Sequence, residues 1–173
     1  MSTQQLILLI INILGGTAVI LSYIYGLKGQ AGGANILWGN VPSGLRPLYF
    51  VSMILSALSY FAFIYYILFR TNPAESNINY YIFYALFLVI LIASAFWMPL
   101  TNVYVNNHAT GTWVAVRSVL ALVALGSIAL VWALFALKPE TRGVAYWLAI
   151  GGAAYFSFHT TILDALTWAA LFR

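Results

Sequence analysis

Five long apolar stretches, separated by short polar breaks, dominate this chain of 173 residues. Hydrophobic residues make up 64% of the chain and charged residues only 6%, whereas ordinary soluble domains are about a quarter charged. A chain with so few charges cannot cover a surface that faces water, so its exterior must face lipid. The stretches therefore predict an all-α integral membrane protein in which residues 1–173 form a single domain.

Each stretch is near or above the roughly 20 residues that an α-helix needs to cross a bilayer. We expect a bundle of five transmembrane helices at about Leu6–Gly26, Leu48–Phe69, Asn79–Leu100, Trp113–Leu137 and Val144–Ala170. Five crossings would place the termini on opposite sides of the membrane; side A is the N-terminal side and side B the other. The long first connection, Leu27–Pro47, is expected to fold back over side B, where a loop of this length often has a binding role.

The composition also excludes several classes of function. The chain has no cysteine, which rules out disulfides and thiolate chemistry, and no group of side chains has the spacing of a metal site. Its Lys and Arg residues flank the apolar stretches, where they serve orientation and lipid headgroups rather than nucleic acid. They divide almost evenly between the two sides, so the positive-inside rule leaves the orientation of this multi-pass protein open.

Small residues cluster within three of the predicted helices, at Gly15–Gly16, around Gly126, and at Gly151–Gly152. Helices in lipid associate by close packing, which small side chains permit. We therefore expect helix contacts at these positions. Aromatic residues near the helix ends, such as Tyr104 and Trp113, are expected to anchor the protein at the membrane interface.

Two charged residues inside the predicted helices lie at matching depth. Asp164 lies roughly 10 Å from the middle of the last span towards side B, at 1.5 Å per residue, and Arg117 lies at a similar depth in the fourth span. Because a buried charge is costly without a partner, an Arg117–Asp164 ion pair is one expectation. The alternative is that Arg117 extends to the interface and water solvates Asp164.

His159 lies within a turn of the middle of the last span. It precedes Asp164 by five residues, which is about 140° around an α-helix of 3.6 residues per turn, so the two should not share a face. Thr160 and Thr161 should share a face with Asp164 and could donate to it. A neutral, hydrogen-bonded packing role is the simplest expectation for His159, with proton handling as the alternative.

Further unusual features gather on side B. Trp97-Met98-Pro99 ends the third predicted span, where proline should kink the helix and free a backbone carbonyl. Asn102 follows one turn later, and Trp38 lies in the glycine-rich first connection. This convergence favours a ligand-binding site on side B whose candidate residues are Trp38, Trp97, Asn102, Arg117, His159, Asp164 and Trp168; we assign no catalytic residue and no metal ligand.

In layout, the whole chain resembles the translocator protein family, the tryptophan-rich sensory proteins or peripheral benzodiazepine receptors. The resemblance rests on the loop residues Trp38 and Pro42, on Leu48-Tyr49 with Met53, on Trp97-Met98-Pro99, and on the segment Thr160–Trp168. Asp164 stands where that family has asparagine, and Met98 separates the Trp-Pro pair. The resemblance implies a five-helix fold with a long first loop and a tetrapyrrole, such as a porphyrin or haem, or a sterol-like molecule as ligand.

We therefore expect a membrane-embedded sensor or carrier of a flat hydrophobic ligand, rather than an enzyme. Trp38, Trp97 and Trp168 would stack on the ligand, and Arg117 could meet a ligand carboxylate. Two alternatives stay open. One is a structural or accessory subunit of a larger membrane complex, or a homodimer; the other is a membrane enzyme or proton-coupled transporter that uses His159 and Asp164.

Overall fold

The computed structural model describes residues 1–28, 33–139 and 141–172, and all regular structure within these ranges is helical. The longest helices are α1 (Thr3–Lys28), α2 (Arg46–Phe69), α3 (Tyr81–Asn107) and α4 (Thr110–Ala136). The first connection forms two short 3-10 helices, η1 (Gly33–Trp38) and η2 (Ser43–Leu45), and its residues 29–32 lie outside the described ranges. The last apolar stretch forms α5 (Val144–Phe158), η3 (His159–Trp168) and α6 (Ala169–Leu171).

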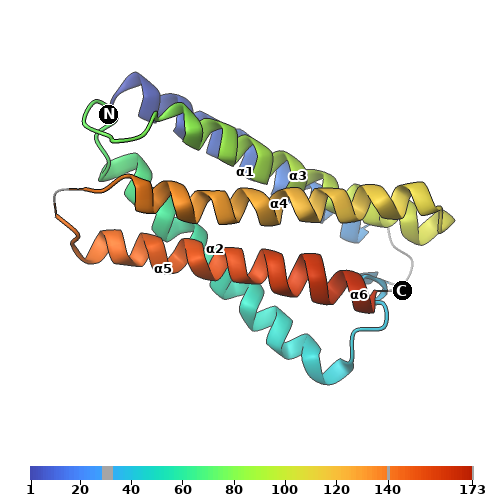
Figure 1. Ribbon diagram of the computed structural model, residues 1–173. Helices are drawn as coiled ribbons and strands as arrows, with labels where there is room; N and C mark the ends of the chain where they lie inside the picture. The colour runs from blue at the N-terminus through green and yellow to red at the C-terminus, as the bar shows by residue number, and fades with distance from the viewer. Residues whose placement is uncertain (29–32, 140, 173) are drawn as a thin grey trace.

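Four helices in the described ranges are long and apolar enough to cross a membrane: α1, the continuous unit Ser43–Phe69, α3 and α4. This confirms the expectation of an α-helical, multi-pass membrane protein but not the count of five spans. The predicted last span is not among these four because α5 is an α-helix of only 15 residues. The chain then changes to the π-helix η3, although α5, η3 and α6 follow one another as a single rod along the bundle (Figure 1).

The third predicted span ended at Leu100, but α3 continues through Pro99 as far as Asn107. Proline removes a single backbone donor from the helix, and the residues around it stay helical. Two residues later, the Thr101 hydroxyl donates to the carbonyl of Trp97 at 2.8 Å. The helix ends only at His108, which adopts a left-handed backbone conformation with a φ of 51°. The prediction that this helix ends at Leu100 was wrong.

The helices pack around the bundle in the order α1, α3, α4, α5 with η3, and α2. The ring is nearly open between α1 and α2, which make few contacts although they are consecutive in the chain. A hydrogen bond from the Tyr60 hydroxyl to the Asn12 side chain joins them in the half nearer side A. Towards side B, α2 diverges from α1, and the chain termini lie at opposite ends of the bundle (Figure 1).

Glycines mark the tightest helix contacts. A Cβ atom added to Gly15 of α1 would lie 2.7 Å from a Leu91 side-chain atom, and one added to Gly126 would lie 2.9 Å from Ile90. At Gly152, the added atom would lie 2.9 Å from the carbonyl oxygen of Ser59. The prediction that the small-residue clusters pack helices together is confirmed at these glycines, whereas Gly16 and Gly151 face open space.

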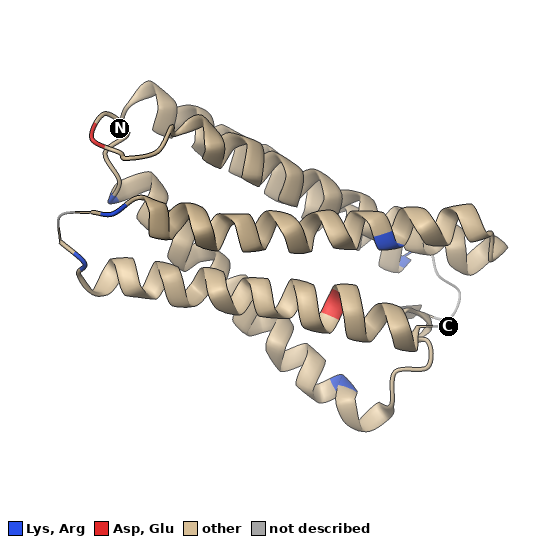
Figure 2. Ribbon diagram, in the orientation of Figure 1, with Lys and Arg blue, Asp and Glu red and all other residues tan. Residues whose placement is uncertain are grey.

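The exterior of the bundle is apolar. Large hydrophobic side chains such as Leu14, Phe61 and Leu125 are exposed near the middle of their helices. Lysine and arginine residues lie mostly towards the two ends of the bundle, and the long helices carry almost no charge between them (Figure 2). This distribution is the one that a bilayer requires, with hydrocarbon around the helices and charged groups at its borders.

Candidate functional site

Aromatic side chains from four parts of the chain meet at the side B end. Trp97 of α3 packs against Trp168 of η3, with ring centroids 5.4 Å apart, and against Tyr23 of α1 at 5.5 Å. Trp168 also contacts Phe172 at 4.4 Å, and Phe172 stacks on Trp113 of α4 at 5.8 Å. Edge and stacked aromatic contacts of this kind orient the rings as well as burying them. The cluster therefore fixes the side B ends of α1, α3, α4 and η3 against one another.

The first connection is fastened to this cluster. The Trp168 indole Nε1–H donates to the carbonyl of Leu37 at 3.0 Å, and the Asn40 amide donates to the carbonyl of Leu171 at 3.1 Å. Between these bonds, Gly39 has a φ of 49°, and a Cβ atom there would collide with the Phe172 carbonyl. Only glycine therefore suits this position, both in backbone conformation and in space. As expected, the loop folds back over side B.

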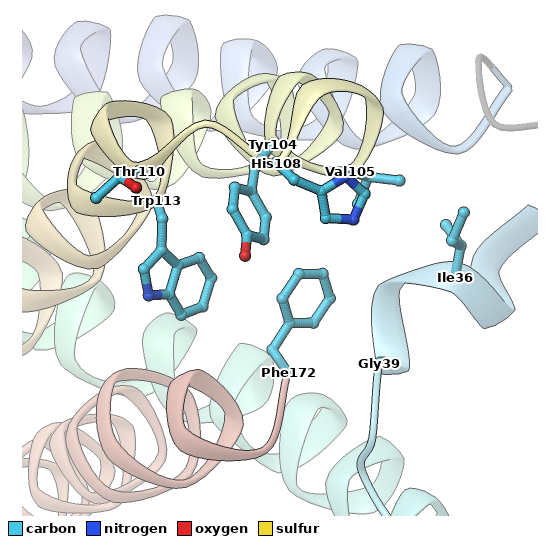
Figure 3. A pocket seen from close by; sticks show the side chains of 8 residues that line it. All are labelled: Ile36, Gly39, Tyr104, Val105, His108, Thr110, Trp113 and Phe172. Carbon is cyan, nitrogen blue, oxygen red and sulfur yellow. The ribbon is translucent and has the colours of Figure 1, made fainter.

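A pocket of about 550 Å³ opens where the loop, the α3–α4 turn and the C-terminal end meet (Figure 3). We call it the mouth pocket; it is lined by Ile36, Gly39, Tyr104, Val105, His108, Thr110, Trp113 and Phe172. Tyr104, Trp113 and Phe172 bring three aromatic rings together from α3, α4 and the C-terminal end (Figure 3). A volume of about 300 to 1,000 Å³ with an apolar, aromatic lining and few polar groups is typical of small-molecule sites.

The structure brings some of the predicted site residues together. Trp97 and Trp168 are in contact, and Trp168 holds the loop segment that ends in Trp38. Trp38 itself packs edge-on against Tyr49 at 5.9 Å and lies under the guanidinium of Arg46 at 5.9 Å. It borders the aromatic cluster without lining the mouth pocket.

Asn102 has a helix-packing contact. Its side-chain amide donates to the carbonyl of Gly26 at 3.0 Å, which ties α3 to the end of α1. Gly26 is buried against Met98 of α3, and a Cβ atom at this glycine would collide with the Met98 side chain. The geometry therefore shows Asn102 in a structural contact at the side B end rather than at the mouth pocket.

The expected Arg117–Asp164 ion pair is not present. Asp164 lies beside the His159 imidazole instead, and Arg117 is exposed on α4. Matching depth is therefore not enough, because the two side chains also have to face each other across the α4–η3 contact. The alternative expectation, in which Arg117 extends out of the bundle, agrees with its exposure.

His159 and Asp164 do share a face, contrary to the prediction from α-helical geometry. The Nε2 atom of His159 lies 3.5 Å from an Asp164 carboxylate oxygen. They meet because η3 is a π-helix, in which residues five apart are bonded. Two hydrogen bonds have this five-residue spacing. The Ala169 amide donates to the carbonyl of Asp164, and the Thr167 hydroxyl donates to the carbonyl of Ile162 at 2.7 Å.

The polar contacts of His159 extend across to α2. Its Nδ1 atom lies 2.9 Å from the Ser52 hydroxyl, which in turn lies 3.0 Å from the Tyr155 hydroxyl. With the carboxylate of Asp164 beside Nε2, the proton is best placed on Nε2, so that Nδ1 accepts from Ser52. We call Tyr155, Ser52, His159 and Asp164 the polar chain; Ser52 and His159 are both buried.

The threonines do not join this chain as expected. Thr160 is hydrogen-bonded to Ser127 of α4 at 2.9 Å, and the buried hydroxyl of Thr161 has no hydrogen-bond partner. A π-helix turns by a smaller angle per residue than an α-helix. The residue five before Asp164 is thereby brought near its face, while the hydroxyl of Thr160 is engaged by Ser127.

Sequence reasoning missed two groups of residues. Tyr104 and Trp113 were expected to be interfacial anchors, but both line the mouth pocket with His108 and Phe172. Their position at helix ends on side B was the available signal. Ser52 and Tyr155 gave no signal, because the sequence does not tell which face of α2 packs against α5.

Within the described ranges, no group of three or more histidine, aspartate or glutamate side chains is placed to hold a metal ion. Comparisons of the chain with known protein families, with curated proteins and with solved structures gave no match. The function must therefore be argued from the geometry of this molecule.

Proposed function

We propose that the protein is a membrane-embedded binding protein, acting as a sensor or carrier, for a flat hydrophobic molecule. The observation that carries the proposal is the mouth pocket, which the first loop, the α3–α4 turn and the C-terminal end build together. Tyr104, Trp113 and Phe172 supply aromatic rings to its lining, and His108 supplies an imidazole. Stacking on such faces suits a planar ring system more than a flexible chain.

Two ligand classes implied by the sequence resemblance have suitable dimensions and character. A tetrapyrrole or a sterol-like molecule has a rigid, largely apolar body that an aromatic-lined pocket of this size can cover in part. The predicted stacking residues Trp97 and Trp168 lie directly behind the pocket through the contact of Trp168 with Phe172. Arg117 is exposed on α4 and does not line the pocket, so the predicted contact with a ligand carboxylate is not part of this proposal.

The proposal includes a fifth crossing of the membrane by the rod formed from α5, η3 and α6. This rod runs from Val144 to Leu171, which exceeds the roughly 20 residues that a span requires. It packs against α2 and α4 along its length. A crossing by this rod would place the C-terminal end, and with it Phe172, beside the other elements of the mouth pocket.

Titration of the detergent-purified protein with protoporphyrin tests the proposal. Quenching of tryptophan fluorescence and the absorbance of the pigment should both saturate in the micromolar range, where a Kd of about 1 μM corresponds to roughly −8 kcal/mol. Phe172→Ala removes one wall of the pocket and should weaken binding about tenfold, or about 1.4 kcal/mol. Phe69→Ala, at the exposed side A end of α2, is the matched control and should bind as the wild type does.

Quenching no stronger than that produced with empty micelles would contradict the proposal. Equal affinity in the Phe172→Ala and Phe69→Ala variants would show that the pigment binds elsewhere. In the first case, the accessory-subunit alternative would be tested next, by asking whether the protein leaves the membrane alone or with other proteins.

The polar chain favours a second candidate function, the movement of protons in a coupled transporter or membrane enzyme. Ionisable residues inside a membrane bundle commonly mark proton pathways. Tyr155, Ser52, His159 and Asp164 form a connected series of hydroxyl, imidazole and carboxylate groups. The candidate ranks second because Ser52 and His159 are almost entirely enclosed, at 3% and 5% exposed.

A further inference from the structure

Asp164 is the only acidic residue in the described helices, and it is set inside the bundle. It lies near Tyr23 of α1 and Tyr49 of α2, and the Tyr49 hydroxyl donates to the carbonyl of the preceding residue, Leu163. Because 34% of its side chain is accessible, the carboxylate is not sealed within the protein.

No basic side chain in the described ranges neutralises Asp164. Its ion-pair contact is the 3.5 Å approach of the His159 imidazole, and the Nδ1 atom of that ring is engaged with Ser52. The other groups that face it, Tyr23 and Tyr49, are neutral phenols. The Tyr49 hydroxyl already donates to the carbonyl of Leu163 at 3.0 Å. An enclosed carboxylate with so few donors retains unused acceptor capacity, which is costly in an apolar bundle.

Aromatic rings stand close to this carboxylate. Tyr23 interacts with Asp164 and packs on Trp97 at 5.5 Å, and Trp97 packs on Trp168, four residues after Asp164, at 5.4 Å. The indole N–H of Trp97 is buried and has no hydrogen-bond partner. A buried donor without a partner is uncommon and is often explained by an absent ligand or water. We call Tyr23, Trp97, Asp164 and Trp168 the inner site.

A carboxylate beside aromatic faces is the arrangement that recognises organic cations. The ring faces attract a positive charge through their quadrupoles, and the attraction grows when water is excluded. The carboxylate supplies the counter-charge, and the unpaired indole N–H can donate to an acceptor on the same ligand. An anionic ligand group would instead be repelled from Asp164, so the charge of this site selects between classes of flat ligand.

We propose that the inner site binds the positively charged nitrogen of a flat aromatic amine, with Asp164 as its counter-ion. This inference rests on the proposed function, since it takes the ligand-binding protein as given and assigns the charge of the ligand. The inner site adjoins the mouth pocket, because Trp168 of the inner site contacts Phe172 and Trp113 of the pocket.

Two dyes of nearly the same shape provide the test. At neutral pH, 9-aminoacridine is protonated and acridine is not. Each dye is titrated into purified protein in a non-ionic detergent, with empty micelles as background, and binding is followed by dye fluorescence and calorimetry. The wild type should bind 9-aminoacridine about tenfold or more tightly than acridine. Asp164→Asn keeps the shape of the side chain and removes the charge, so this preference should disappear while acridine affinity stays the same.

Glu75→Gln is the matched control, because it removes a carboxylate from the side A connection, outside the inner site. It should keep the wild-type preference. Equal affinity of the wild type for the two dyes, or an undiminished preference in Asp164→Asn, would overturn the inference. If protoporphyrin binds at the mouth pocket and neither dye binds, the inference fails and the proposed function stands. If none of the three binds, the proposed function fails as well.

Discussion

Single residues decide how the side B end is closed. Trp168 illustrates this, since one indole packs on Trp97 and Phe172 and donates a hydrogen bond to the loop at Leu37. Its neighbour in space, Gly39, allows the loop backbone to approach the C-terminal end closely. Polar contacts of this kind matter in a membrane protein, where helix association gains little from the hydrophobic effect.

Gly39→Ala should loosen the loop and weaken ligand binding. An alanine at this position would face both the cost of a positive φ and a collision with the Phe172 carbonyl, together about 1–3 kcal/mol of local strain. The expected result is faster proteolysis of the first connection and a lower thermal unfolding midpoint. Gly44→Ala is the control, because a Cβ atom there meets open space. Identical behaviour of the two variants would refute the proposed fastening of the loop.

At the scale of elements, the π-helix η3 changes which residues meet. In an α-helix, His159 and Asp164 would lie on different faces, whereas in η3 they come within 3.5 Å. Helix propensities and apolar periodicity describe α-helices, so they give no sign of this change of register. The long spans α1 to α4 were predictable, because length and apolarity alone define them.

The rod of α5, η3 and α6 is expected to cross the membrane as one element. The chain has no cysteine, so single cysteines introduced at Thr141, Asn107 and Ala170 can be labelled without background. In sealed vesicles, an impermeant maleimide should label Ala170→Cys from the same side as Asn107→Cys and from the side opposite to Thr141→Cys. Labelling of Ala170→Cys from the side of Thr141→Cys would show that the rod does not cross.

At the scale of the whole molecule, the end of the bundle at which the candidate site lies was easier to predict from sequence than the residues in contact there. The convergence of the first loop, Trp97 and Trp168 at side B is present in the structure. The lining by Tyr104, His108 and Phe172 was not predictable, because it depends on how far α3 extends and where the C-terminal end turns. The Arg117–Asp164 pair failed for a related reason, since depth along a helix does not fix rotation about its axis.

The central claim is that the side B end, and no other part of the bundle, binds a flat hydrophobic molecule. The most direct measurement is photolabelling with 1-azidopyrene, a flat aromatic probe, in lipid vesicles, followed by mass-spectrometric mapping of the labelled residues. We expect labels concentrated at the α3–α4 turn and at the C-terminal end, around Tyr104, Trp113 and Phe172, and reduced by excess protoporphyrin. Labels spread evenly over the lipid-facing residues of α1 and α4, with no effect of protoporphyrin, would contradict it.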